Sequence, residues 1–157
     1  MTMTHEISMT GGRSAADRYR GALALAEAIP LSLVQLAGRI AVAHVFWQSA
    51  QTKLASWPVT LQLFAMEYRL PLIDPTIAAP LATAAELAGS LLIFFGLFAR
   101  LGALVLLGIV ATIQIFVYPQ NWAEHLMWAS LLLLILSRGA GVVSLDHIAG
   151  RLFRRGA

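Results

Sequence analysis

Long apolar stretches alternate with short polar interruptions between residues 31 and 137. Four of these stretches approach the roughly 20 apolar residues that an α-helix needs to cross a bilayer. They run near residues 31–50, 77–99, 101–117 and 122–137. The pattern therefore predicts an all-α fold, an integral membrane four-helix bundle.

Polar residues before the first stretch predict a short helix outside the bundle. Ser14 followed by Asp17 has the spacing of a capping box. Pro30 should end or kink that helix, which we expect to be amphipathic and to lie on the membrane surface. Residues 1–13 show no periodicity and are expected to be disordered. They lack the apolar core of a cleavable signal peptide.

The region between the first two stretches is too polar and too interrupted by prolines to span a membrane. It predicts a short helix or re-entrant segment at the interface, followed by Asp74 and Pro75 as the N-cap and first residue of the second span. The expected domain organisation is a polar N-terminal tail with an interfacial helix (1–30), a four-span membrane domain (31–147) and a basic C-terminal tail (148–157).

Little more than Arg100 separates the second and third stretches, which predicts a tight antiparallel hairpin. Small residues recur at helical spacing along the second stretch. Small side chains let helix backbones approach each other closely in a membrane, where lipid gives no hydrophobic driving force. The residues concerned are Ala78, Ala82, Ala85, Gly89 and Gly96.

Composition and charge support a membrane protein and suggest its orientation. Of 157 residues, 59% are hydrophobic and 12% are charged, about half the charged fraction of soluble domains. Eight of the eleven basic residues fall on the side that holds both termini, so we expect a bacterial-type inner (plasma) membrane with both termini cytoplasmic. The basic residues are not interleaved with aromatics in a polar region, so nucleic-acid binding is not expected.

Titratable and amide side chains within the spans are the candidate functional residues, because burying a charge there costs at least about 2.5 kcal/mol. Counted along each span, most of them fall roughly 18–20 Å from the cytoplasmic boundary, as one polar layer. Arg39 lies less deep and could reach Glu86. The candidates are Arg39, His44, Glu86, Gln114 and His125, with Lys53 and Glu124 at the outer ends of their spans.

Two interpretations of this layer stay open. It could be a polar chamber or proton path, or a hydrogen-bonded layer that only fixes helix register, with Arg39 neutralising Glu86. Lys53 is expected to extend to the lipid headgroups, and an ion pair with Glu86 is its alternative. A metal site of His44, Glu86 and His125 is a weaker alternative, because no HxxxH or HExxH spacing is present. The chain has no cysteine, no glycine-rich phosphate loop and no nucleophile elbow, so a self-sufficient enzyme is not expected.

Three segments resemble the DoxX family of small membrane proteins. Arg39 is followed by Phe46, Trp47 and Lys53 in the family's first-span pattern. The stretch 86–102 is similar to the family's glutamate, glycine and GLF-x-R turn. The stretch 139–146 (GAGVVSLD) resembles its closing GPG-x-x-SLD, with Ala140 in place of proline. The resemblance covers about residues 31–147. The positions that match the family's motifs are Arg39, Lys53, Glu86, Gly96 and Arg100.

The resemblance implies a four-helix membrane protein that accompanies redox proteins. We therefore expect a membrane subunit or partner of a quinone-, sulfur- or thiol-linked redox system, that is, an oxidoreductase subunit not catalytic alone. A quinone is the candidate ligand, with His44, Gln114 and Arg39 as its hydrogen-bond donors. The expected partners are the lipid bilayer and a redox protein, and a homo-oligomer stays open. The alternative is a non-catalytic scaffold or small-solute carrier whose polar layer is structural.

Overall fold

The computed structural model describes residues 14–155, and the regular structure in that range is entirely helical. The chain divides into two units, Met1–Pro30 and Leu31–Ala157. The first contains helix α1 (Ala15–Glu27), which begins with the predicted capping box: the Ser14 hydroxyl accepts from the Asp17 backbone, and the Asp17 carboxylate accepts from the Ser14 backbone. No residue of α1 is buried. The disorder expected for residues 1–13 lies outside the described residues.

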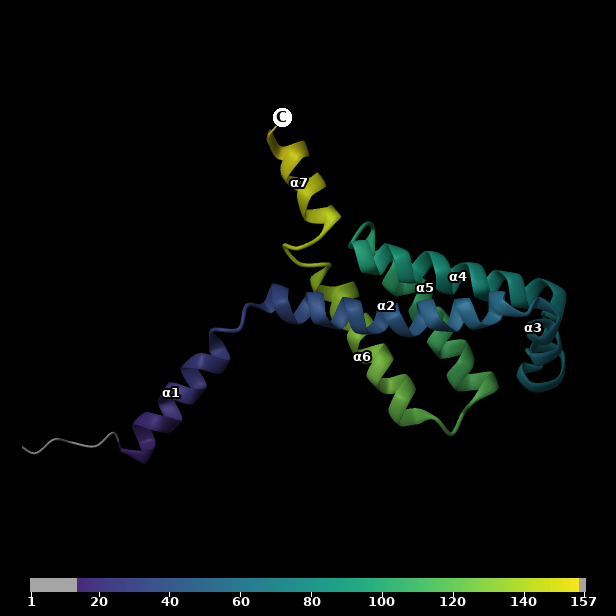
Figure 1. Ribbon diagram of the computed structural model, residues 1–157, viewed down its shortest axis with the longest axis horizontal. Coiled ribbons are helices and arrows are strands. Elements are labelled where there is room, and N and C mark those ends of the chain that lie inside the picture. The colour runs from purple at the N-terminus through teal and green to yellow at the C-terminus, as the bar shows by residue number, and fades with distance from the viewer. Residues whose placement is uncertain (1–13, 156–157) are drawn as a thin grey trace, which may run out of the picture. The chain divides into compact units, whose positions relative to one another are not determined.

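The second unit is a bundle of four long helices, which confirms the predicted all-α bundle (Figure 1). Helix α2 lies against α4 and α6, α4 packs on α5, and α5 packs on α6, so the four helices form a closed ring. Shorter helical segments connect or follow them. In chain order the elements are α2 (Leu31–Ala55), α3 (Trp57–Leu63), η1 (Phe64–Tyr68), α4 (Pro75–Phe95), α5 (Ala99–Thr112), η2 (Ile113–Val117), α6 (Trp122–Arg138) and α7 (Leu145–Arg155).

Helix α4 and the continuous stretch Ala99–Val117 are long and apolar enough to cross a membrane. A third candidate arises only when α1 and α2 are counted together. Helix α6 has 17 residues, about 25 Å of rise against about 30 Å of hydrocarbon. The chain is therefore a multi-pass helical membrane protein by composition and length, and the count of four spans stays a prediction.

The predicted hairpin between α4 and α5 is confirmed, but its turn lies at residues 96–98, and Arg100 is the second residue of α5. The chain reverses at Gly96, whose φ of +63° is a left-handed conformation that glycine adopts without strain. At Gly89 an added Cβ would lie 2.7 Å from Leu106 Cγ, so this helix crossing requires a residue without a side chain. Packing there buries Leu106 and Ile93 completely, at the centre of the main core.

The segment between α2 and α4 is a helical cap over one end of the bundle. Helix α3 runs into η1, a π-helical turn that ends at Arg69 with a left-handed backbone. Phe64 packs there on Ala78 and Ala79 of α4 in a second, smaller core. Asp74 caps α4 as predicted: its carboxylate accepts from the backbone N–H of Thr76 at 2.8 Å.

Helix α7 was not predicted from the sequence, where residues 148–157 were interpreted as a basic tail. Its first turn is bonded to the bundle, since the Asp146 backbone N–H donates to the carbonyl of Gly96 at 2.9 Å. The Asp146 carboxylate also accepts from the backbone N–H groups of Phe98 and Ala99, at 2.8 and 3.1 Å. Asp146 therefore caps α5 from 47 residues further along the chain.

Candidate functional site

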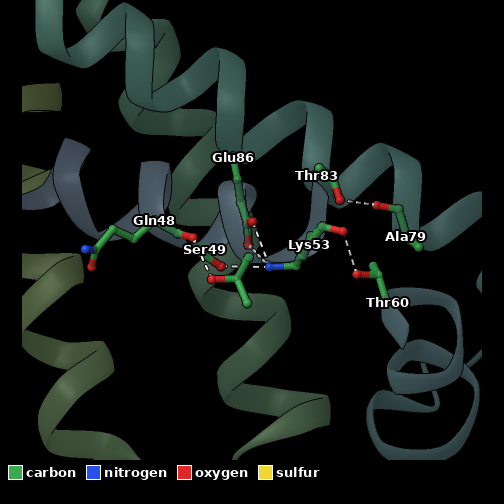
Figure 2. Close-up of polar contacts among 8 residues, drawn as sticks. Gln48, Ser49, Lys53, Thr60, Ala79, Thr83 and Glu86 are labelled. Atoms are coloured by element: carbon green, nitrogen blue, oxygen red, sulfur yellow. Dashed lines mark hydrogen bonds and ion pairs between the residues drawn. The ribbon is translucent and has the colours of Figure 1, made fainter. Parts of the chain in front are cut away.

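Lys53 and Glu86 form a buried ion pair between α2 and α4 (Figure 2). The Lys53 ammonium donates to both carboxylate oxygens of Glu86, at 2.8 and 3.0 Å, and to the Ser49 hydroxyl at 2.7 Å. Lys53 is 7% exposed and Glu86 is 2% exposed. The expectation that Lys53 reaches the headgroups is wrong, and its alternative, the ion pair with Glu86, is confirmed.

Lys53 points inward because it lies on the buried face of α2, at helical spacing from Phe46 and Ala50. Lys53 lies in the last turn of α2, where the helix dipole favours a cation. The hydroxyl of Thr60 donates to the Lys53 carbonyl at 2.8 Å, so α3 is bonded back onto that turn. The predicted Arg39–Glu86 pair is wrong: Glu86 pairs with Lys53, and the Arg39 guanidinium donates to four backbone carbonyls instead.

A cavity of about 200 Å³ lies beside this ion pair, between α2, α4, α5 and α6. Its wall combines aliphatic and aromatic side chains, and its polar residues come from six separate elements or loops. Asn121 and Glu124, both exposed, mark where the cavity meets the surface. The lining residues used below are Phe46, Lys53, Phe64, Tyr68, Glu86, Ile113, Val117, Tyr118, His125 and Trp128.

His125 presents one ring nitrogen to a fixed partner. The Gln114 amide donates from Nε2 to the Pro119 carbonyl at 2.9 Å, which turns its Oε1 toward His125 Nδ1 at 2.7 Å. Since Oε1 only accepts, Nδ1 carries the proton, and Nε2 of the neutral ring is a hydrogen-bond acceptor. No group among residues 14–155 hydrogen-bonds to that Nε2, while His125 is 3% exposed and lines the cavity.

Two tyrosines supply hydroxyl groups at the same cavity. The Tyr118 hydroxyl donates to Glu67, and burial together with that bond raises the pKa of Tyr118. Burial, followed by the charge of Glu86, raises the pKa of Tyr68. Both phenols therefore keep their protons at physiological pH. The two rings contact each other edge to face, with centroids 5.9 Å apart.

The cavity is bordered by both π-helical turns. Phe64 and Tyr68 belong to η1, and Ile113 and Val117 belong to η2. π-Helical turns are rare and occur frequently at functional sites. Phe46 and Trp128 close another part of the wall, with ring centroids 5.8 Å apart.

Arg39 lies away from this cavity and is 2% exposed. Its guanidinium donates to four backbone carbonyls: Ile93 at 2.8 Å, Phe94 at 2.6 Å, Ala140 at 2.9 Å and Val143 at 2.6 Å. These carbonyls end α4 and belong to the loop after α6, so Arg39 joins the two. The expectation that Arg39 donates to a quinone is wrong, because its three nitrogens are already bonded to the chain.

The glycines of the family motifs fit closely around this arginine. An added Cβ on Gly96 would lie 2.7 Å from Arg39 Nη2, and one on Gly141 would lie 2.8 Å from Gln35 Oε1. Gln35 in turn donates to the carbonyls of Arg138 and Gly139. Arg100 lies at the same junction and donates to the Ser137 carbonyl at 3.4 Å.

His44 is exposed on the opposite face of α2 from Lys53. It lines a second, largely apolar groove of about 330 Å³ with Trp47, Ser90 and Phe94. The predicted layer thus falls into three places: Glu86, Gln114 and His125 at or beside the cavity, Arg39 at the junction, and His44 in the groove. Within residues 14–155 no three His, Asp or Glu side chains are grouped as metal ligands, so the alternative metal site is not assembled here.

Sequence reasoning missed the two tyrosines and Trp128 as cavity residues. Tyr68 and Tyr118 lie near the ends of apolar stretches, where tyrosines are also typical of the aromatic belt at membrane surfaces. Pro119 directly after Tyr118, and Arg69-Leu-Pro71 after Tyr68, mark two helix ends, and both ends are π-helical. An aromatic residue directly before each proline-marked helix end was the sequence signal that could have indicated these cavity residues.

The fold and site define a multi-pass helical membrane protein with a cavity inside its bundle that is lined by aliphatic, aromatic and polar side chains. The sequence profile of the DoxX family matches residues 34–119, more than half of the chain, so the chain belongs to the DoxX family. The matched range includes Arg39, Lys53, Glu86 and the GLF-x-R turn, while the closing motif at 139–146 lies beyond it. No curated protein and no solved structure shows significant similarity to the chain.

Proposed function

We propose that this DoxX protein is a membrane component of a redox system and that its cavity binds the headgroup of a quinone or quinol. The observation that carries the proposal is one cavity that combines aromatic side chains, two protonated phenols and an imidazole Nε2 with no hydrogen-bond partner among residues 14–155. A quinone carbonyl accepts hydrogen bonds, as from Tyr68, and a quinol hydroxyl donates them, as to His125 Nε2.

The size of the cavity fits a single substituted ring. A buried apolar cavity of about 150 Å³ holds benzene, and this cavity has about 200 Å³. The opposite charges of Lys53 and Glu86 cancel, so the pair has no net charge. A neutral headgroup in the cavity therefore does not face an isolated ion. Figure 2 shows the pair bridging α2 and α4.

The chain supplies binding, orientation and a proton acceptor. It has no cysteine for thiol chemistry, so electrons would pass between the ligand and a partner oxidoreductase. The proposed setting is the bacterial-type inner membrane with both termini in the cytoplasm. That orientation rests on the distribution of basic residues.

The proposal is tested by measuring how much quinone the purified protein retains and how tightly it binds added quinone. The purified parent should retain quinone on extraction and should bind a short-chain quinone added in detergent. His125→Gln keeps a donor and an acceptor, but one amide cannot occupy the positions of both ring nitrogens, so either the Gln114 contact or the ligand contact is lost. Affinity should fall at least about tenfold, the factor that corresponds to one lost hydrogen bond of about 1.4 kcal/mol.

His44→Gln is the matched control, because His44 lies on the other face of α2. It should bind as the parent does. No quinone binding by the parent would contradict the proposal, as would equal loss in both variants.

A second candidate is a non-catalytic scaffold or solute carrier, favoured by the Arg39 junction, where a buried charge has only structural partners. It predicts that both histidine variants behave as the parent does.

A further inference from the structure

Helix α7 is amphipathic and its apolar face is uncovered. Leu145, Ile148 and Leu152 recur at helical spacing, with Phe153 beside them. Their side chains are 42%, 53%, 65% and 80% exposed, respectively. The bundle therefore leaves this apolar face without a protein partner among residues 14–155.

Basic residues occupy the opposite face. Arg151 and Arg154 are both exposed, and Arg154 also donates to the Gly150 carbonyl at 3.0 Å. The helix has one acidic residue, Asp146, whose carboxylate is occupied by the backbone N–H groups of Phe98 and Ala99. The free charge of the polar face is therefore positive.

The start of α7 is fixed at the end of the bundle. Asp146 is bonded to Gly96, which ends α4, and to Ala99, which begins α5. Those are the helices that are long and apolar enough to cross the membrane, so α7 begins where their hydrocarbon-spanning parts end. Figure 1 shows α7 (yellow) running across the direction of α2 and α4 rather than continuing along it.

We propose that α7 lies in the membrane interface and binds anionic lipid headgroups. Its apolar face enters the boundary between headgroups and acyl chains, and Arg151 and Arg154 attract the negative surface. An apolar face opposite arginines is the composition of helices that lie in this plane. The helix thereby fixes the junction around Arg39 against the membrane surface.

Single-cysteine labelling of the full chain tests this, because the chain has no cysteine of its own. Leu152→Cys and the matched control Gly150→Cys, on the opposite face, would each carry an environment-sensitive fluorophore. At Gly150 an added Cβ meets only the end of the Arg154 side chain, at 3.6 Å. The labelled proteins would be reconstituted in vesicles of phosphatidylcholine alone, or of equal parts phosphatidylcholine and phosphatidylglycerol.

In the anionic vesicles the label at 152 should be blue-shifted and shielded from aqueous acrylamide, while the label at 150 is quenched. Arg151→Gln and Arg154→Gln should each lower the docked-to-undocked ratio about fivefold, from about 1 kcal/mol per arginine. High salt should have the same effect. Equal quenching at 150 and 152 would overturn the proposal. So would shielding that ignores lipid charge and both arginines, which would indicate docking on protein, including a second copy of this chain.

Discussion

At one end of the bundle the buried cation is Arg39, surrounded by four carbonyl oxygens; at the other it is Lys53, facing a carboxylate beside a cavity. The guanidinium is planar and carries five donors in a fixed fork, which suits several carbonyls held by the backbone. The ammonium is a compact charge on a flexible stem. The two ends therefore use buried charge for different tasks.

The backbone also differs between the two ends: it is closely packed around Arg39 and leaves open space beside Lys53. At the Arg39 end, Gly96 and Gly141 have positive φ and leave no room for a side chain. At the cavity end, η1 and η2 are π-helical and open space lies between them. The comparison indicates that the family's glycine and arginine motifs hold the bundle together, whereas the lysine and glutamate belong to the wall of the cavity.

The largest expected effect is at the cavity end. Glu86→Ala leaves the Lys53 ammonium buried without a partner and should destabilise the protein by about 3–5 kcal/mol. Thermal unfolding in detergent measures this loss. An unchanged melting temperature would show that water reaches Lys53 and that the pair contributes nothing.

The double variant Lys53→Met/Glu86→Leu is the control for this prediction. Replacing both members of a buried pair by apolar residues is often neutral, so the double variant should recover most of the stability. It should still fail to bind quinone if the pair contributes to the site. A double variant as unstable as Glu86→Ala would mean that side-chain volume, rather than the unpaired charge, causes the loss.

Arg39→Lys tests the junction and should lower the free energy of unfolding by about 1–3 kcal/mol. Lysine keeps the charge but has three donors for four carbonyls, so at least one buried acceptor loses its partner at about 1–3 kcal/mol. Thermal unfolding checks the loss, and quinone affinity of the folded variant should match the parent's. A loss of affinity below the unfolding temperature would contradict the separation of the two ends.

Patterning along the chain was sufficient to predict the four long helices of the bundle and several helix ends, but not α7. The capping box at Ser14, the Asp74 cap and the hairpin between α4 and α5 depend on residues close together in sequence. Such local signals act through backbone geometry that sequence spacing defines.

The site was predicted less well because depth along a helix does not define direction around it. His44 and Lys53 are on one helix, yet nine residues at about 100° each place them on nearly opposite faces. Arg39 was assigned to Glu86 by reach alone, since the carbonyls that bind it lie 54 to 104 residues further along the chain. No pattern in one sequence shows that those carbonyls are gathered at one point.

The smallest effect is expected at the two aspartates that cap helices, Asp74 and Asp146. Asp74 caps α4 from two residues away in an exposed turn, and hydrogen bonds from the hydroxyl and backbone N–H of Thr76 lower the pKa of Asp74. Asp146 caps α5 across 47 residues. Asp146→Asn should therefore lower the melting temperature more than Asp74→Asn, because asparagine has one acceptor oxygen for the two N–H groups that Asp146 binds.

The pH dependence of Asp74→Asn isolates the local cap. Because folding lowers the pKa of Asp74, its carboxylate stabilises the native state fully above the unfolded value of about 3.9, and this contribution is lost as pH falls through the lowered pKa. The parent should melt slightly above Asp74→Asn at pH 7, and the difference should shrink toward pH 3. A difference that stays constant over this range would show that the cap acts through its shape, with no contribution from its charge.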